Sequence, residues 1–148
     1  MKNTVSVLNE LLVNTFNDIL SIEQKALHAG AFKDLSVTEI HTIEAIGMYG
    51  TKTMSEVAGI IGITVGTLTT AINHLVRKEY VTREKSEEDR RVVHISLTRK
   101  GKLAYRVHEK FHADMVQAII AELTAEEEEV LIKSLDKLNC FFRKKIQS

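Results

Sequence analysis

A run of small, uncharged side chains near the middle of the chain has residue types suited to molecular recognition. These residues are Thr64, Val65, Gly66, Thr67, Thr69, Thr70 and Asn73. Threonine hydroxyls form hydrogen bonds with base edges or phosphates, and threonine and valine methyls contact thymine methyls. Asn73 offers the donor and acceptor pair that adenine requires. This chemistry favours contact with A·T-rich DNA.

A second group is a pair of arginines at the end of the charged segment 86–91, which reads Ser-Glu-Glu-Asp-Arg-Arg. Arg90 and Arg91 suit a narrow minor groove, where the negative potential of DNA is strongest. Asp89 could hold one of them in position through a carboxylate pair. Three acidic residues beside the arginines also fit a solvated turn, so the elements around the segment must decide between the two interpretations.

A third group could bind a metal ion. His108 and His112 lie four residues apart, on one face of a helix, as zinc ligands often do. His41, with Glu44 or Glu23 from other helices, could complete such a site. A histidine pair on a helix is also common as polar surface or as a hydrogen-bonding feature of a dimer, so the sequence assigns no metal and no cofactor.

The sequence contains no motif of an enzyme. It has no glycine-rich phosphate loop, no nucleophile elbow and no paired catalytic carboxylates. The acidic run 126–129 follows the helix cap Thr124, where the helix dipole stabilises negative charge. The single cysteine, Cys140, excludes an intramolecular disulfide and fits a reducing compartment.

Charge is balanced over the whole chain but not along it. Lys and Arg total 20, and Asp and Glu total 20, which argues against a protein that coats any polyanion. Segment 77–110 is nevertheless basic, and segment 114–136 is strongly acidic, so only the middle of the chain can face phosphate. No apolar run approaches membrane-spanning length and the start has no signal-peptide core, so we expect a cytoplasmic protein that binds no membrane.

Periodicity and capping residues predict the elements that must position these groups. Apolar residues step by three to five from Val5 to about Leu27, and a Ser or Thr followed three residues later by Glu marks three further helix starts. The expected helices are 5–27, 36–47, 53–62, 64–80, 98–123 and 124–142. Residues 80–83 read as a strand, 86–89 as a polar turn, and 93–97 alternate with period two, which together predict a β-hairpin.

The middle elements together have the layout of a winged helix. Gly62 lies in a tight turn between two short helices, and Ala58 suits their close crossing, as in a helix-turn-helix whose second helix enters the major groove. A hairpin carrying two arginines directly afterwards corresponds to a wing. We therefore predict a mainly α fold (an α+β winged helix) in one domain, with a winged lobe at 36–97 and a helical dimerisation lobe formed by 1–35 with 98–148.

The chain resembles the MarR-type winged-helix regulators over essentially its whole length. Their wing signature, Asp-x-Arg-x-x-x-(Val/Ile)-x-Leu-Thr-x-x-Gly, is met by Asp89, Arg91, Ile95, Leu97, Thr98 and Gly101. Within that family the segments 39–43, 67–70 and 89–93 are similar to repressors of bacterial fatty-acid synthesis genes. The resemblance implies a homodimer, built by the first and the last two helices, on a pseudo-palindromic operator. Exposed apolar stripes on the terminal helices independently favour a partner.

The resemblance also implies an effector, an acyl chain delivered on acyl carrier protein as co-repressor. The apolar residues that could line a tunnel for it are Phe16, Leu20, Ile43, Ile46, Leu103, Val107 and Phe111. Such stripes are core more often than ligand pockets. An acidic carrier could dock on the basic residues Arg99, Lys102 and Arg106. The alternatives are a zinc-responsive member of the family, or a winged-helix module for protein interaction, which would have no need of the arginine tip.

Overall fold

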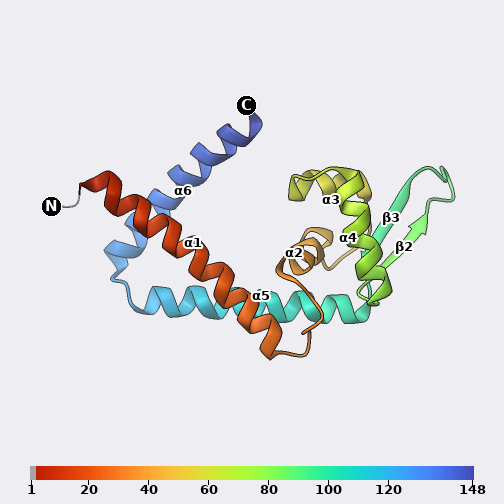
Figure 1. Ribbon diagram of the computed structural model, residues 1–148, viewed down its shortest axis with the longest axis horizontal. Coiled ribbons are helices and arrows are strands. Elements are labelled where there is room, and N and C mark those ends of the chain that lie inside the picture. Colours follow the sequence, from red (N-terminus) through yellow and green to blue (C-terminus); the bar gives the residue numbers. More distant parts are fainter. Residues whose placement is uncertain (1–2) are drawn as a thin grey trace. The chain divides into compact units, whose positions relative to one another are not determined.

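The structure, a computed structural model, describes residues 3–148 and contains two compact units, one ending at His108 and the other spanning Glu109–Ser148. Helices dominate, and one small sheet completes the architecture (Figure 1). In chain order the elements are α1 (Thr4–Ala29), α2 (Val37–Ile46), β1 (Lys52–Thr53), α3 (Met54–Ile61), α4 (Val65–Arg77), β2 (Val81–Lys85), β3 (Val93–Leu97), α5 (Arg99–Ala121) and α6 (Ala125–Gln147). The predicted class, mainly α with a winged helix, is confirmed.

The helix starts follow from side chains that satisfy free backbone amides. In α2, the Ser36 hydroxyl accepts a hydrogen bond from the Glu39 amide at 3.1 Å, and the Glu39 carboxylate accepts one from the Ser36 amide at 3.0 Å. Thr124 and Glu127 form the same reciprocal pair at the start of α6. Because these contacts are local, the sequence predicts them correctly.

Helix α4 ends at Arg77 rather than at about Tyr80, where the sequence pattern places its end. Glu79 has a left-handed backbone with a φ of 69°, and the Tyr80 amide donates to the Leu75 carbonyl at 2.9 Å. This is a Schellman turn with glutamate at the position that glycine usually occupies. The turn stops the helix and directs the chain into β2.

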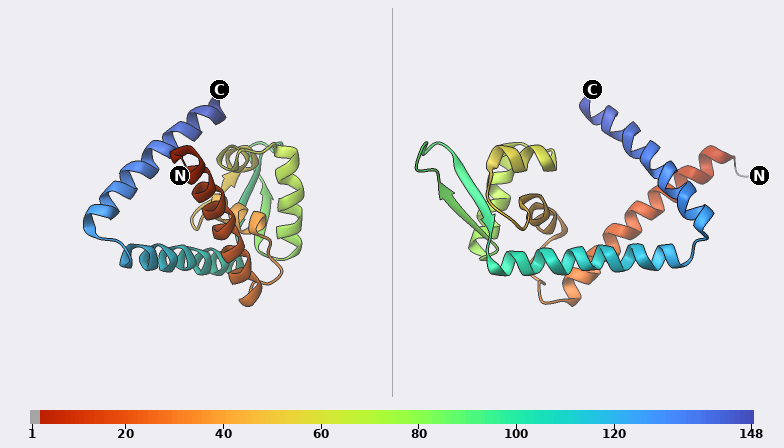
Figure 2. Two further views of the ribbon diagram at one scale, coloured as in Figure 1. Left: turned by 60° about the vertical axis from the view of Figure 1, so that its left-hand side comes forward. Right: turned by 180° about the vertical axis from the view of Figure 1, so that it is seen from behind.

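The sheet has the antiparallel order β1-β3-β2, and its centre is β3. Lys52 and Arg83 oppose Ile95 from the two neighbouring strands. Strand β1 has two residues, too few for an alternating pattern to appear, so the sequence does not predict it. The hairpin of β2 and β3 extends away from α4, which is visible from the front and from behind (Figures 1 and 2).

The hydrophobic core of the first unit lies between α2, α3, α4 and the sheet. Its fully buried side chains include Ile40, Ile43, Ile46, Val57, Leu68, Ile72, Leu75, Tyr80 and Ile95. In contrast, no residue of the second unit, Glu109–Ser148, is buried. The packing that fixes α4 and the hairpin therefore belongs to the first unit.

No single helix within residues 3–148 is long and apolar enough to cross a membrane. Helices α3 and α4 pass the same test of length and composition only as a pair that is bent by 105°. Their buried residues, such as Val57 in α3 and Leu68 in α4, belong to the core described above.

Candidate nucleic-acid interface

Helices α3 and α4 form the predicted helix-turn-helix. Gly62 ends α3 with a left-handed φ of 82°, and Thr64 caps α4 by accepting a hydrogen bond from the Thr67 amide at 3.2 Å. Leu68, Ile72 and Leu75 hold one face of α4 in the core. The predicted contact residues Thr64, Val65, Gly66, Thr67, Thr70 and Asn73 are all exposed, and Thr69 is half-buried. The structure therefore brings this set together on one side of the helix.

Local hydrogen bonds decide which groups on α4 remain available. The Thr69 hydroxyl donates to the Val65 carbonyl at 2.8 Å, so it faces outward as an acceptor with an adjacent methyl group. The hydroxyls of Thr64 and Thr67 lie 2.9 Å apart and share a hydrogen bond. Within the described residues, the Thr70 hydroxyl has no partner and keeps both its donor and its acceptor for a ligand.

Two grooves flank the exposed face of α4. The first has a volume of about 540 Å³ and is lined by Ser36, Thr38, Glu39, Gly66, Thr67, Thr70, Ala71 and His74. The second, of about 430 Å³, is lined by Thr53, Met54, Ser55, Val65, Thr69, Arg83, Arg91, Val92 and Val93. The second groove, between α3, α4 and the hairpin, holds two guanidinium groups and is suited to an anionic backbone.

The hairpin tip holds one of the two predicted arginines in place. Asp89 accepts hydrogen bonds from Arg91 Nε at 3.1 Å and from Arg91 Nη2 at 3.3 Å, and also from the Arg91 amide at 3.0 Å. The hydrogen bonds from the Arg91 side chain and then from its amide lower the pKa of the Asp89 carboxyl. The Arg91 side chain nevertheless remains 91% exposed. Arg90 is exposed and has no partner among the described residues, so no contact in the structure fixes its side chain.

Arg83, which no sequence motif marks, lies between the hairpin and α4. Val81 is buried in the core, and Arg83 lies two residues further along β2, on the same face of the strand. Its guanidinium donates a hydrogen bond to the amide oxygen of Asn73 on α4. The available signal was the two-residue side-chain period of a strand, which places Arg83 on the same face as the apolar Val81.

The sequence and the fold of the chain are similar to those of known DNA-binding proteins. A sequence model of the MarR family matches residues 35–93. The FabT protein of Streptococcus pneumoniae, solved in complex with DNA, is 44% identical to the chain, and the match covers 93% of this chain and 96% of that chain with a TM-score of 0.89. The chain belongs to the MarR family.

Two further comparisons define how far the similarity extends. The HTH-type transcriptional regulator YpoP of Bacillus subtilis (strain 168) is 35% identical over 69 residues, which are 47% of this chain, and the chain spans 49% of that relative. A mutant MarR from E. coli, complexed with operator DNA, is 23% identical over 92% of this chain and 96% of that chain, with a TM-score of 0.72, which supports the fold alone. This MarR-family chain is a DNA-binding transcription regulator and not an enzyme, as the sequence predicts.

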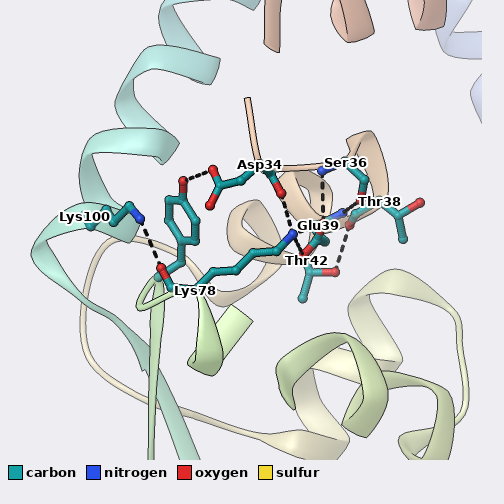
Figure 3. Close-up of polar contacts among 8 residues, drawn as sticks. Asp34, Ser36, Thr38, Glu39, Thr42, Lys78 and Lys100 are labelled. Atoms are coloured by element: carbon teal, nitrogen blue, oxygen red, sulfur yellow. Dashed lines mark hydrogen bonds and ion pairs between the residues drawn. The ribbon is translucent and has the colours of Figure 1, made fainter. Parts of the chain in front are cut away.

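In this MarR-family protein the C-terminal end of α4 is anchored to the start of α2. The Lys78 ammonium donates to the two Glu39 carboxylate oxygens at 3.0 and 2.9 Å, and to the Asp34 carbonyl (Figure 3). The Tyr80 hydroxyl donates to the Asp34 carboxylate at 2.6 Å, and Lys100 donates to the Lys78 carbonyl at 3.1 Å. We call these five residues the anchor of α4. They fix the helix at the end opposite to Thr64.

The hydrogen bonds of the anchor favour the ionised carboxylate of Glu39. Burial raises the pKa of Glu39, but the hydrogen bonds from Lys78 and Ser36 outweigh burial, so the pKa lies below its ordinary value. Burial, followed by the hydrogen bond to Asp34, raises the pKa of Tyr80, which keeps its hydroxyl proton as a donor. The anchor is therefore complete at neutral pH.

We expect Lys78→Met to lower the free energy of unfolding by roughly 1–2 kcal/mol at about pH 7. The folded pKa of Glu39 is lowered, so the ion pair stabilises the protein above the ordinary value of 4.5 and is lost as the pH falls through the lowered pKa. The difference between wild type and variant should therefore shrink once the pH lies below that lowered pKa, to the part that comes from the hydrogen bond of Lys78 to the uncharged Asp34 carbonyl. Urea unfolding across that range measures it, with Lys33→Met as the control for an exposed lysine. A difference that is as large in acid as at neutral pH would contradict the ion-pair explanation.

The predicted metal-ligating histidines are partly brought together. Glu23 and His108 are buried, with 2% and 3% exposure. The Glu23 carboxylate oxygen lies 2.8 Å from His41 Nε2 and 3.1 Å from His108 Nε2, and the Glu44 carboxylate also lies 3.1 Å from His108 Nε2. The ligand atoms of Glu23, His41 and His108 all lie within 4.8 Å of one another. His112 belongs to the second unit.

The residues that could line an acyl tunnel fall into two groups. Ile43 and Ile46 are buried in the core of the first unit. Phe16, Leu20, Leu103 and Val107 are between 50% and 58% exposed, and Phe111, in the second unit, is half-buried. The structure therefore gives Ile43 and Ile46 a packing role and leaves the four residues on α1 and the first part of α5 at least half exposed.

Proposed function

We propose that this MarR-family protein is a homodimeric repressor of bacterial fatty-acid synthesis genes, with long-chain acyl–acyl carrier protein as its co-repressor. The observation that carries the proposal is the 44% identity to FabT, which extends over 93% of the chain and therefore includes the terminal helices as well as the winged lobe. The sequence segments that resemble fatty-acid-synthesis repressors support the same gene class.

The contact with the operator is proposed to use α4 in the major groove and the hairpin tip in the adjacent minor groove. The exposed threonines of α4 supply hydrogen bonds and methyl contacts without charge, which suits base edges. Arg90 and Arg91 supply positive charge at the far end of the hairpin, where a narrow minor groove attracts it. The groove that contains Arg83 and Arg91 would take the sugar–phosphate backbone between the two contacts.

The proposed dimer would cover the apolar faces of the terminal helices. On α1, Val5, Leu8 and Leu11 are all more than half exposed. In the second unit, Val130, Ile132 and Leu135 are also more than half exposed, and no residue there is buried. Helices gain most of their stability from packing an apolar face, so these faces favour a second copy of the chain. Residues 1–35 with 98–148 would form the dimerisation lobe.

Acyl–acyl carrier protein would contact two kinds of surface. Arg99, Lys102 and Arg106 are exposed along the first turns of α5 and would attract an acidic carrier. Phe16 and Leu20 on α1 are exposed apolar side chains that would accept an acyl chain. The two surfaces belong to the same unit of the chain.

Fluorescence anisotropy with labelled promoter DNA of a fatty-acid synthesis gene tests the proposal. Long-chain acyl–acyl carrier protein should tighten binding by at least about fivefold, as effectors that couple two sites do. The matched controls are the carrier without an acyl chain and a duplex cut to one half-site, which a dimer should bind more weakly. Equal affinity for promoter and random duplex would contradict the proposal that the protein regulates these genes. If the acyl chain does not change the affinity for DNA, the proposed co-repressor is wrong.

A zinc-responsive regulator is the second candidate, and the cluster of Glu23, His41 and His108 favours it. Two imidazole nitrogens and a carboxylate oxygen are a ligand set that zinc accepts, and two of the three residues are buried. Zinc titrated into chelator-treated protein should bind with one site per chain, and His41→Gln should abolish it. His28→Gln, which changes an exposed histidine on α1, is the control. DNA binding that requires zinc would move the effector to this cluster.

A further inference from the structure

Asn73 and Arg83 form a contact between the helix that faces DNA and the stem of the hairpin. Val65, Thr69 and Asn73 are spaced four residues apart on α4, and the first two line the groove that also contains Arg83 and Arg91. Arg83 reaches across from β2 and donates to the amide oxygen of Asn73. Both residues are exposed, so neither is held by the core.

The chemistry of the guanidinium determines which way the Asn73 amide faces. Arginine has five N–H donors and no acceptor, so only the oxygen of the Asn73 amide can be its partner. The Asn73 nitrogen, with two donors, must therefore point away from the guanidinium. No other amide orientation keeps this hydrogen bond.

This orientation changes what Asn73 offers to a base pair. Recognition of adenine by asparagine is bidentate, because the amide oxygen accepts from adenine N6 while the amide nitrogen donates to N7. When Arg83 holds the oxygen, Asn73 presents its N–H groups. Both purines have the N7 acceptor, and guanine adds O6, so a donor alone distinguishes A·T from G·C poorly. The adenine contact that the Asn73 residue type favours is therefore blocked in this structure.

We propose that Arg83 is a specificity-determining residue, because it holds the amide oxygen of Asn73 and makes Asn73 a hydrogen-bond donor toward DNA. The inference rests on the proposed role of α4 as the helix that contacts base edges. Asn73 would then donate to either purine at its base pair. The exposed threonines nearer the start of α4 would determine the A·T preference. Among the described residues, Arg83 has no acidic partner, so its charge also remains available to the groove.

Selection from a pool of randomised duplexes by the full-length protein, followed by sequencing, measures base preference at every position. The position that Asn73 contacts is the one whose preference changes in Asn73→Ala. There, the wild type should discriminate adenine from guanine by less than about threefold. Arg83→Met keeps the length of the side chain but frees the amide oxygen, so preference for adenine should rise to about tenfold, within the range of a bidentate contact. The double variant Arg83→Met with Asn73→Ala should lose this gain in adenine preference.

Lys85→Met is the matched control, because Lys85 lies on the same face of β2 and has the same charge but does not contact Asn73. It should lower affinity for all sequences alike, with no change in base preference. Thermal unfolding should show that Arg83→Met is folded, with a midpoint within about 3 °C of wild type.

Three outcomes would overturn the inference. Arg83→Met could weaken all duplexes equally, as Lys85→Met does, which would make Arg83 a phosphate contact. The gain in adenine preference could survive in the double variant, which would assign it to another residue. Asn73→Ala could change no position while the wild type still selects a sequence, in which case Asn73 does not contact a base. A wild type that selects no sequence would instead contradict the proposed function.

Discussion

Gly101→Ala is expected to lower the free energy of unfolding by at least about 3 kcal/mol, a large effect for adding one methyl group. A Cβ at this position would lie 2.1 Å from the Tyr80 carbonyl oxygen and 3.3 Å from Leu97 Cβ. Real side chains do not approach a backbone oxygen so closely, so either α5 or the start of β2 must move. Neither moves freely, because the same Tyr80 carbonyl accepts a hydrogen bond from the Thr98 amide at 3.0 Å.

Denaturant unfolding measures this loss, and Gly59→Ala provides the matched control. Gly59 also lies inside a helix, and a Cβ there would meet no atom within 4 Å. Alanine at that position should stabilise the protein by up to about 1 kcal/mol, because it lowers the entropy of the unfolded chain. A Gly101→Ala variant as stable as wild type would show that the first turn of α5 does not pack tightly on β2.

Gly101 also illustrates what the sequence reveals and what it does not. The signature from Asp89 to Gly101 identifies the hairpin and the start of α5, and Thr98 acts as the expected cap, since its hydroxyl accepts from the Gly101 amide at 3.0 Å. The reason for the glycine is not local. It lies in the distance between α5 and a carbonyl about twenty residues earlier, which no periodic pattern encodes.

The helices and the hairpin were predictable because their signals lie within a few residues of each element. Capping residues and apolar spacing indicated the starts of α2, α4 and α6, and the end of α4 was misplaced. That end depends on Glu79 in a left-handed conformation, which sequence patterns favour for glycine or asparagine. The fold class was therefore accessible from short-range physics alone.

The residue contacts that define the candidate site were harder to predict from the sequence, because they form between distant segments. Arg83 contacts Asn73 only after β2 packs beside α4. His108 looks like surface on an isolated helix, but it is 3% exposed and lies 3.1 Å from the Glu23 carboxylate, because α1, α2 and α5 converge there. Ile43 and Ile46, which the sequence left open as tunnel or core, are in the core of this structure.

The double variant Arg90→Ala with Arg91→Ala is expected to lower affinity for a specific operator by at least about a hundredfold, while the protein stays folded. Both side chains are exposed and support no part of the core, so their loss should change stability by less than about 0.5 kcal/mol. In the proposed dimer the change removes four positive charges. If all four face phosphates, the slope of log affinity against log salt should fall by about three to four.

Variants of the neighbouring acidic residues distinguish the effect of the arginine charges from the effect of how Arg91 is positioned. Glu87→Ala with Glu88→Ala alters the same turn but keeps both arginines, so affinity should be retained or rise as negative charge is removed. Asp89→Ala keeps the charge of Arg91 but removes its bidentate partner, so the arginine would have to be ordered by DNA at an entropic cost. An intermediate loss is therefore expected for Asp89→Ala. If instead the double arginine variant binds the operator as tightly as wild type at every salt concentration, the hairpin does not enter the minor groove, and sequence recognition must reside in α4 alone.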